Sequence, residues 1–382
     1  MNQIRFCLIG TGYVGCTLVS GIEQLKQQKI DYTGVPLGEQ VEGYTAQDLS
    51  CVLAFDVDGK KIGKPLDLIS KSYPELQGNA APTITIQQGV ELGSLDGMPI
   101  TIKSLDQRVS LADACNAVSR MIRDTEIDVV IIATPTEAMQ TFATYDEIGD
   151  AIAKNNKERL TASIFYAYAA LMAARERKRG ICVINGIPSE IANSPAFIAL
   201  AQETNSIVIG DDLSTGQSRL LSDMMEHFKE LNRTVTSLVG ANWGGNMDFC
   251  RLQDSKRNES KKKTKTGCAS DILGYEVPSD IRPHGYLPPL GDRKAVLIHV
   301  PYKTFGGIED ELFIVGRNTD SPAAAGMLVD LVRLGKIALD RRCAGAVSPI
   351  NGFYCKRWGK QKSKVLHFQD LCAWLHGEKS AI

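Results

Sequence analysis

The sequence of 382 residues has little of what metal centres and disulfide frameworks require. It contains five histidines, none at a close metal-ligand spacing, so we interpret each as a structural residue. Its ten cysteines are scattered from Cys7 to Cys372 without a Cys-x-x-Cys pair, and several lie in apolar segments. We therefore expect reduced thiols in the core and no dedicated zinc site.

Charge of one sign is also scarce, since the formal net charge is −1. Only the stretch from Lys256 to Lys265 is strongly basic, and it lacks the interleaved aromatic residues on which nucleotide bases stack. We do not expect nucleic-acid binding. On charge alone, this stretch is either a solvated basic loop or a site for an anion.

Long hydrophobic runs are missing as well. No apolar run approaches the length of a membrane span, and the first residues lead into an apolar segment without the pattern of a cleavable signal. A content of 43% hydrophobic and 23% charged residues is typical of a globular chain, here long enough for two domains. We expect a cytoplasmic protein without membrane contact.

What the sequence does contain begins with a strand, a glycine turn and a helix. Residues 4–9 are apolar, Gly10-Thr11-Gly12-Tyr13-Val14-Gly15 follows, and apolar residues then recur at helical spacing. In this context Gly10 permits a tight turn, Gly12 lets the backbone approach a pyrophosphate, and Gly15 lets the helix pack on the strand. The sequence therefore predicts a dinucleotide-binding site at residues 10–15.

A second apolar strand, residues 52–55, ends at Asp56 and Asp58, where an acid is expected to bind the adenosine ribose of NAD. The acid arrives later than the usual interval of about 20 residues, so residues 27–48 are expected to form an inserted loop. Two lysines and no arginine cluster follow, which favours NAD over NADP. The alternative for Asp56 is a structural role at the strand end.

Three further apolar strands are predicted at residues 128–133, 181–184 and 206–209, each ending in a polar segment. The carboxyl ends of parallel strands face the ligand in an open α/β sheet, so these segments should line one cleft. The expected fold class is α/β, with a doubly wound Rossmann-type parallel sheet. The residues expected to contact the cofactor there are Thr134, Pro135, Asn185, Asp211 and Asp212.

After a helix predicted at residues 222–231, the pattern changes. Strands predicted near 234–240, 295–302 and 311–317 are rich in β-branched residues and are not separated by regular helices. This is typical of an antiparallel sheet, here in an inserted α+β domain.

The end of the chain is predicted to return to the first domain. A long amphipathic helix is expected from residue 323 to about 341, with Ser321 as its N-cap and Pro322 in its first turn. We expect an NAD-binding domain at 1–218, an inserted catalytic and oligomerisation domain at 219–320 and a C-terminal return at 321–382.

The stretch from residue 242 to 265 concentrates groups that suit a phosphorylated sugar. The side chains that can exchange hydrogen bonds with sugar hydroxyls are Asn242, Asn246 and Asp248. Lys261 and Lys265 are four residues apart, so on a helix they would share one face. An anion between them would relieve their repulsion, and a phosphate is such an anion.

Together these residues resemble the motifs of the myo-inositol-1-phosphate synthase family, particularly its short prokaryotic form. The resemblance is an ordered series that spans most of the chain. Its parts are the glycine turn at 10–15, the Phe55–Asp58 acids, Gly210-Asp211-Asp212 with Thr215-Gly216-Gln217-Ser218, the residues 242–248, Ser260-Lys261 with Lys265, Gly291-Asp292-Arg293-Lys294, Asp320-Ser321-Pro322 and Lys356.

The resemblance implies conversion of D-glucose 6-phosphate to 1L-myo-inositol 1-phosphate, with a tightly held NAD that is reduced and reoxidised within one turnover. Oxidation at C5 would acidify the C6 protons, the enolate would attack the C1 aldehyde, and the C5 ketone would then be reduced. Such chemistry needs cations beside two oxygens that become negative, and a phosphate anchor. The family assembles as a tetramer through its inserted domain, which implies a homotetramer here.

Carried over residue by residue, the resemblance implies a lysine-rich site. Lys261, with Lys356 beside it, would serve the charge at the C5 oxygen, and Lys294 would polarise the C1 carbonyl. The residues implied to bind phosphate are Lys265, Thr215, Gly216, Gln217 and Ser218. Those implied to position hydroxyls and lysines are Asn242, Asn246, Asp248 and Asp320. Asp211 and Asp212 would lie near the nicotinamide ribose or a metal ion, because some family members use divalent or monovalent cations.

Two positions depart from the family pattern. Glu137 places a bulky acid in the turn after the 128–133 strand, and we expect it near the cofactor. Ser214 stands where a lysine is usual near the nicotinamide. Two alternatives therefore stay open, a divergent NAD-dependent enzyme acting on another sugar phosphate and a non-catalytic NAD-binding sensor. The presence of four separated lysines favours the synthase.

Overall fold

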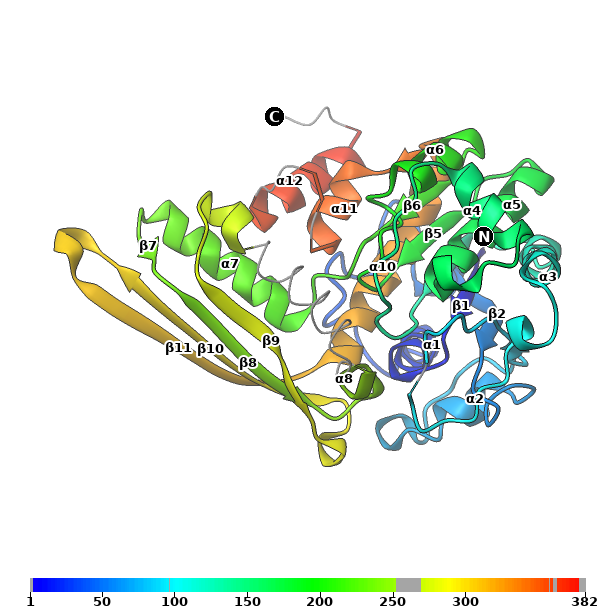
Figure 1. Ribbon diagram of the computed structural model, residues 1–382, viewed down its shortest axis with the longest axis horizontal. Coiled ribbons are helices and arrows are strands. Elements are labelled where there is room, and N and C mark those ends of the chain that lie inside the picture. Colours follow the sequence, from blue (N-terminus) through cyan, green and yellow to red (C-terminus); the bar gives the residue numbers. More distant parts are fainter. Residues whose placement is uncertain (1–2, 96, 252–268, 357, 360–362, 378–382) are drawn as a thin grey trace.

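The structure is a computed structural model in which residues 3–95, 97–251, 269–356, 358–359 and 363–377 are described. Two sheets organise these residues, and the second extends away from the first (Figure 1). Within the described part, no helix is long and apolar enough to cross a membrane.

The first sheet has seven parallel strands in the order β12-β6-β5-β4-β1-β2-β3. Its strands are β1 (Ile4–Ile9), β2 (Leu49–Asp56), β3 (Gln87–Gln88), β4 (Val129–Ile132), β5 (Cys182–Asn185), β6 (Ile207–Ile209) and β12 (Gly345–Ala346). Strand order reverses between β1 and β4, which makes their carboxyl ends the expected site of a ligand crevice. The doubly wound fold predicted from the sequence is confirmed.

Alternating side chains of β1 enter two separate cores. Ile4, Phe6 and Leu8 pack with α1 (Tyr13–Lys26) and α10 (Asp320–Asp340) on one face of the sheet. Cys7 and Ile9 pack on the other face with α3 (Leu111–Asp124), α4 (Tyr145–Ala153), α5 (Ala162–Arg177) and α6 (Pro195–Glu203). Both faces are therefore dry, as the continuous apolar runs of parallel strands require.

The inserted loop at residues 27–48 contains only a short 3-10 helix, Ala46–Asp48, and is held against α10. Asp330 and Arg333 of that helix are completely buried as an ion pair. Arg333 donates to the backbone oxygens of Gly38 and Glu39 at 2.9 and 2.8 Å, and Asp330 accepts from Leu37 N at 3.0 Å. The loop thus supplies the partners that a buried charge pair needs.

The second sheet is mixed, in the order β11-β10-β8-β9, with β7 paired to β10. Its strands are β7 (Thr234–Val235), β8 (Leu238–Gly244), β9 (Ser279–Tyr286), β10 (Arg293–Lys303) and β11 (Glu309–Thr319). The predicted strands pair antiparallel as expected, and the sheet is mixed because an additional strand, β9, runs parallel to β8. One face is covered by α7 (Gly216–Glu230), whose apolar side chains join those of the strands in a third core.

Two helix starts differ from the predictions. α7 begins at Gly216, six residues before the predicted start, and α10 begins at Asp320 with Thr319 as its N-cap. Ser321 therefore lies inside α10 and is not the cap. Other helices of the described part are α2 (Leu66–Ser70), α8 (Met247–Arg251), α11 (Ser348–Tyr354) and α12 (Lys364–Leu375), and residues 269–273 are helical as well.

Candidate active site

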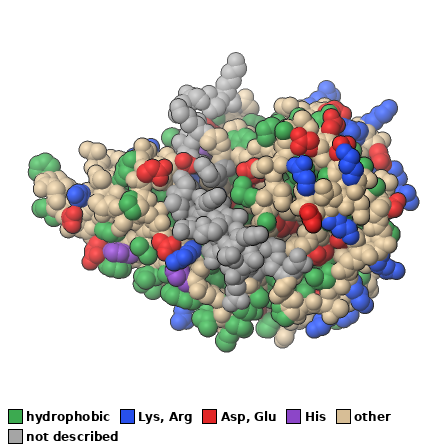
Figure 2. Space-filling model, viewed as in Figure 1, with side chains coloured by type: hydrophobic (Ala, Val, Ile, Leu, Met, Phe, Trp, Pro, Cys, Tyr) green, Lys and Arg blue, Asp and Glu red, His purple; other side chains and the backbone are tan. Residues whose placement is uncertain are grey.

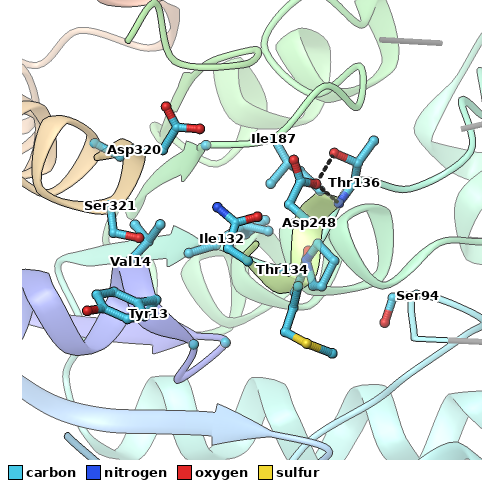
Figure 3. A pocket seen from close by; sticks show the side chains of 18 of the residues that line it. Tyr13, Val14, Ser94, Ile132, Thr134, Thr136, Ile187, Asp248, Asp320 and Ser321 are labelled. Carbon is cyan, nitrogen blue, oxygen red and sulfur yellow. Dashed lines mark hydrogen bonds between the residues drawn. The ribbon is translucent and has the colours of Figure 1, made fainter. Parts of the chain in front are cut away.

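A cavity of about 560 Å³ opens where the carboxyl ends of the first sheet meet the second sheet (Figure 3). Its volume is in the range of small-molecule and cofactor sites. Segments from both sheets line it, including Gly10, Gly12–Val14, Phe55–Asp58, Ile132–Thr136, Gly186–Pro188, Gly245–Asp248, Gly291, Asp292, Lys294, Asp320, Ser321 and Lys356.

The glycine turn has the geometry that a pyrophosphate requires. Gly10 has φ +95°, and a Cβ there would lie 2.7 Å from the oxygen of Ala133. A Cβ on Gly15 would lie 2.6 Å from the oxygen of Gly10, whereas one on Gly12 would meet nothing within 4 Å. Gly12 therefore borders open space at the start of α1, whose N-terminus has no side-chain cap. Uncapped N–H groups at a helix start are suited to an anion.

At the end of β2, the two predicted ribose acids have different surroundings. Both are largely buried and line the cavity. Asp56 accepts hydrogen bonds from Thr11 and forms an ion pair with Lys61 at 3.1 Å. Asp58 accepts from the backbone N–H of Lys60 at 2.9 Å.

The turn after β4 connects the two sheets across the cavity. Thr134 and Pro135 line it as predicted residues of the cofactor site, and the Thr134 hydroxyl, within the described part, is buried without a partner. Thr136 donates to Asp248 Oδ1 through its hydroxyl at 2.7 Å and its N–H at 3.3 Å (Figure 3). Because Asp248 belongs to α8, this contact joins the two halves of the site.

The two departures from the family pattern lie behind the cavity wall. Glu137 is 1% exposed, does not line the cavity, and accepts from the N–H and hydroxyl of Ser163 on α5. Burial raises the pKa of Glu137, and these hydrogen bonds oppose that shift. Ser214 is also buried and does not line the cavity. The expectation that Glu137 stands near the cofactor is therefore wrong for this structure.

Lys356 and Asp212 form a buried ion pair at the cavity. The Lys356 ammonium donates to Asp212 Oδ2, and the backbone N–H of Lys356 donates to the backbone oxygen of Asp212 at 2.9 Å. Both residues line the cavity, and their side chains are 8% and 10% exposed. A cation fixed in this way can stabilise a developing negative charge with little rearrangement.

Lys294 and Asp320 form the second pair, on the side of the second sheet. Their charged atoms are 3.4 Å apart, and the Lys294 ammonium lies 5.7 Å from the ring centre of Phe249. Lys294 is the second residue of strand β10, and Asp320 is the first residue of α10, next to Ser321 in the view of the cavity (Figure 3). Lys294 of β10 and Lys356 of the segment after α11 thus reach one cavity.

Asp292 belongs to the Gly291–Lys294 motif, and the sequence alone indicates no role for it. It is 2% exposed, accepts from the N–H and hydroxyl of Ser321 at 2.9 and 2.8 Å, and accepts from Asn246 Nδ2 at 3.4 Å. Burial raises the pKa of Asp292, against the effect of these bonds. It fixes Asn246 and the start of α10 together. Its position two residues before Lys294, a predicted site residue, is the sequence feature that could have indicated this role.

Several predicted residues do not line the cavity, among them Thr11, Gly15 and Gly216, and three of them, Asn185, Asp211 and Asn242, are buried in its wall. Asp211 accepts from the backbone N–H groups of Ile191, Ala192 and Asn193, and also from Asn185 Nδ2 at 2.8 Å. Asn242 is fully buried in β8 and donates to the oxygen of Arg282 at 3.2 Å. The structure therefore does not bring Asn185, Asp211 or Asn242 into the cavity.

The predicted phosphate site coincides with the start of α7. Thr215 is its N-cap without a side-chain hydrogen bond, and Thr215 and Ser218 line the cavity. Gln217 is 3% exposed and lies outside the lining, and neither polar atom of its side chain has a partner within the described part. Lys261 and Lys265 lie outside the described residues. The described His, Cys, Asp and Glu side chains form no group of three or more that could hold a metal ion.

Comparison with known proteins places this geometry in a family. A family model described as myo-inositol-1-phosphate synthase matches residues 216–321. Inositol-3-phosphate synthase of Mycolicibacterium smegmatis is 25% identical, over 98% of this chain and 99% of its own. The enzyme of that name in Corynebacterium glutamicum is 28% identical, over 93% of each chain.

Solved structures agree with these matches. Inositol-3-phosphate synthase of Caenorhabditis elegans has the same fold, with a TM-score of 0.77 at 18% identity over 98% of this chain and 85% of its own. A myo-inositol-1-phosphate synthase-related protein of Thermotoga maritima superposes with a TM-score of 0.93 and is 41% identical over all of both chains. Because similarity of this extent covers the whole sequence, the chain belongs to the myo-inositol-1-phosphate synthase family.

Proposed function

We propose that the protein converts D-glucose 6-phosphate to 1L-myo-inositol 1-phosphate, using NAD that is regenerated in each turnover. The observation that carries this proposal is the meeting of Lys356 and Lys294 at one cavity opposite the glycine turn. The proposed reaction develops negative charge on two different sugar oxygens, and each lysine could serve one of them.

The residues that would hold the dinucleotide are the glycine turn at 10–15, the uncapped start of α1 and the turn at Thr134 and Pro135. The open space at Gly12 and the unpartnered Thr134 hydroxyl fit such a group. When bound, NAD would supply a hydride acceptor for C5 of the sugar and return the hydride to the same carbon.

The substrate phosphate would bind at the start of α7, where N–H groups without a side-chain cap can donate to its oxygens. Thr215 and Ser218, which line the cavity, would contribute there together with Gly216 at the start of the helix, and Lys265 keeps the role implied by its motif. Gln217 would support this end of the helix from behind.

Lys356 would hold positive charge beside the C5 oxygen, because its buried partner Asp212 keeps the ammonium in place. Lys294 would polarise the C1 carbonyl during ring closure, with Asp320 orienting it. Lys261 keeps its proposed part in proton transfer at C5. Asp292 and the Thr136–Asp248 contact would keep Asn246 and these lysines in register with the cofactor.

A homotetramer is proposed through the open face of the second sheet. Val315 is 79% exposed and Phe313 is 55% exposed, and both lie in cross-strand rows with Leu297 and His299. In Figure 2, hydrophobic side chains are visible at the surface of the part that contains the second sheet, at the left, and many charged side chains are visible over the first sheet, at the right. Apolar faces of this kind are typical of subunit contacts.

We also propose that the chain divides into the three parts predicted from the sequence, 1–218, 219–320 and 321–382. Most of α7 packs on the second sheet, and α10, which starts at Asp320, packs on the first. Lys294 would then belong to a different domain from the cofactor site, whereas Lys356 would lie in the part that returns to the NAD-binding domain.

The test is to incubate the purified protein with glucose 6-phosphate and a trace of NAD. We expect inositol phosphate in the phosphorus NMR spectrum without net absorbance from NADH. Steady formation of NADH in proportion to product would instead identify a divergent dehydrogenase. Bound NAD without product or NADH would refute the synthase reaction and favour a sensor.

A further inference from the structure

The chain reaches Lys356 from the end of α11, and this end is completed by a residue of another helix. α11 ends at Tyr354, and the last carbonyl groups of a helix have no partner within the helix itself. Two of them, those of Gly352 and Cys355, accept from the ammonium of Lys364 at 2.6 and 2.5 Å. Lys364 is the first residue of α12 and is 3% exposed. A buried ammonium of α12 therefore binds the backbone immediately before Lys356.

The residues that follow α11 pair with the segment after β6. The N–H of Ser214 donates to the backbone oxygen of Tyr354 at 2.8 Å. The N–H of Lys356 donates to the backbone oxygen of Asp212 at 2.9 Å. Cys355, between these two bonds, forms an isolated antiparallel bridge with the facing residue. The pairing therefore sets the backbone position of both members of the Lys356–Asp212 ion pair at the cavity.

The contacts of the two helices meet at Cys355. Its N–H donates to the backbone oxygen of Asn351 at 3.0 Å, its oxygen accepts from Lys364, and its side chain is fully buried. Burial raises the pKa of the Cys355 thiol, Asp211 raises it further, and Lys364 lowers it. The ammonium of Lys364 and an acid of the cavity wall therefore lie within electrostatic reach of the same residue.

Helix α12 is packed closely enough on α11 to direct this ammonium (Figure 1). A Cβ on Gly352 would lie 2.3 Å from His367 Nδ1, so the imidazole ring rests directly on the backbone of α11. The ring centres of Phe353 and Phe368 are 5.0 Å apart. Leu371, one turn after His367, is fully buried in the core of the first sheet. The position of Lys364 is therefore fixed by the packing of its helix.

We infer that Lys364 is a positioning residue for Lys356. From α12 it holds the carbonyl groups that precede Lys356, and it thereby sets the direction in which that lysine enters the cavity. The inference rests on the proposed catalytic role of Lys356. Lys364 does not line the cavity, so it acts through the backbone and not on the substrate.

The first measurement is amide hydrogen exchange on the full chain, which does not depend on turnover. Lys364→Met removes the ammonium and leaves an apolar side chain of similar length. Exchange at the N–H groups of Ser214 and Lys356 should become about tenfold faster, because the backbone pair that protects them loses its anchor. Unchanged exchange at both groups would overturn the inference.

A matched variant of the same helix separates positioning from a general loss of stability. Leu371→Ala removes buried apolar contacts of α12 without touching the two carbonyl groups. It should lower the denaturation midpoint at least as much as Lys364→Met, and leave exchange at Ser214 and Lys356 unchanged. Equal acceleration of these two groups in both variants would overturn the inference. If Lys364→Met does not fold, Lys364→Gln, which keeps a polar donor, replaces it and should show the same pattern with a smaller effect.

Kinetics then test whether this position matters to the chemistry. Lys364→Met should lower kcat about tenfold or more and leave KM nearly unchanged, because a displaced catalytic group weakens transition-state contacts. In the Lys356→Met protein the same substitution should have no further effect, since the group that it positions is gone. An unchanged kcat in Lys364→Met, or an equal loss in both backgrounds, would overturn the inference. A wild-type protein that forms no inositol phosphate would refute the proposed reaction, whereas the exchange measurement would still decide whether Lys364 holds the backbone at Lys356.

Discussion

The two sheets of the protein differ in how much of them is buried. The first is covered by helices on both faces. Even the charged residues Asp330 and Arg333 of its covering helix α10 are paired in the interior. The second is covered by α7 on one face and exposes Phe313 and Val315 on the other. The first sheet uses both faces for its own cores, whereas the second leaves exposed the face that is proposed above for subunit contact.

The same difference appears in the two lysine pairs of the cavity. Lys356 and Asp212, beside the first sheet, are nearly inaccessible, whereas Lys294 and Asp320, at the second sheet, have side chains that are 11% and 26% exposed. The first pair should therefore serve both folding and chemistry, and the second mainly chemistry. The predictions below test this distinction.

The largest effect is expected from Lys356→Met. It removes a proposed cation and leaves Asp212 buried without its partner, so activity should fall about 1000-fold and unfolding free energy by about 3 kcal/mol. Activity assays and denaturant titration measure the two losses. Lys356→Met/Asp212→Leu should recover much of the stability and none of the activity. Recovery of activity in the double variant would contradict the proposed role of Lys356.

Lys294→Met should lower activity about 100-fold or more, with a change in unfolding free energy below about 1 kcal/mol, because its pair is partly open to solvent. Lys303→Met at the far end of β10 is the matched control, since its partner Glu309 is largely exposed and both are remote from the cavity lining. A loss of stability equal to that of Lys356→Met would remove the distinction between the pairs.

Charge on the open face should break assembly and leave the fold intact. We expect Phe313→Glu/Val315→Lys to reduce the molar mass measured by light scattering to that of a smaller species, because desolvating two charged side chains at a contact is costly. Val109→Lys, at an exposed position before α3, is the control. An unchanged mass in the double variant would exclude this face as the contact, as would a monomeric wild-type protein.

The smallest effect concerns pH. The folded-state pKa of Asp292 is raised above its ordinary value of 3.8 by burial, so the folded state binds its proton more tightly than the unfolded state. Wild-type stability relative to Asp292→Asn should therefore fall as pH rises from about that value through the raised pKa, and then stay constant. Denaturant titrations between pH 4 and 7 measure the difference. A difference that grows with pH would contradict the raised pKa.

Local patterns predicted the first sheet well, because glycine spacing and apolar runs in residues 4–15 are sufficient to indicate a strand, turn and helix. Strand β9 was missed because Pro283 and His284 interrupt its apolar pattern, although it pairs with β8. The early start of α7 was missed because its first turn, Gly216-Gln217-Ser218, has the composition of a loop.

The site was harder to predict where a partner is distant in the sequence. Ser321 looked like a helix cap, but Asp292, 29 residues away, accepts the bond from its hydroxyl. The contacts of Asp56 with Thr11 and Lys61 could not be predicted from the strand pattern, because these partners come from the glycine turn and from the segment after β2. Glu137 looked exposed to the cofactor, but Ser163 of α5 holds it in the interior. Sequence spacing indicates which residues lie near the ends of the strands. Only the packing of segments that are distant in the sequence determines the direction and the partners of each side chain.

The junction of β11 and α10 has a mechanical consequence. Thr319 ends the strand and Asp320 begins the helix, so no loop separates the open sheet from the buried helix of the first core. A strand and a helix that are joined without a loop are expected to move together. Any shift of the second sheet when subunits meet would be transmitted to Asp320 and Ser321 in the cavity. If the proposed subunit contact shifts the second sheet, this junction would carry the shift to the residues proposed for catalysis.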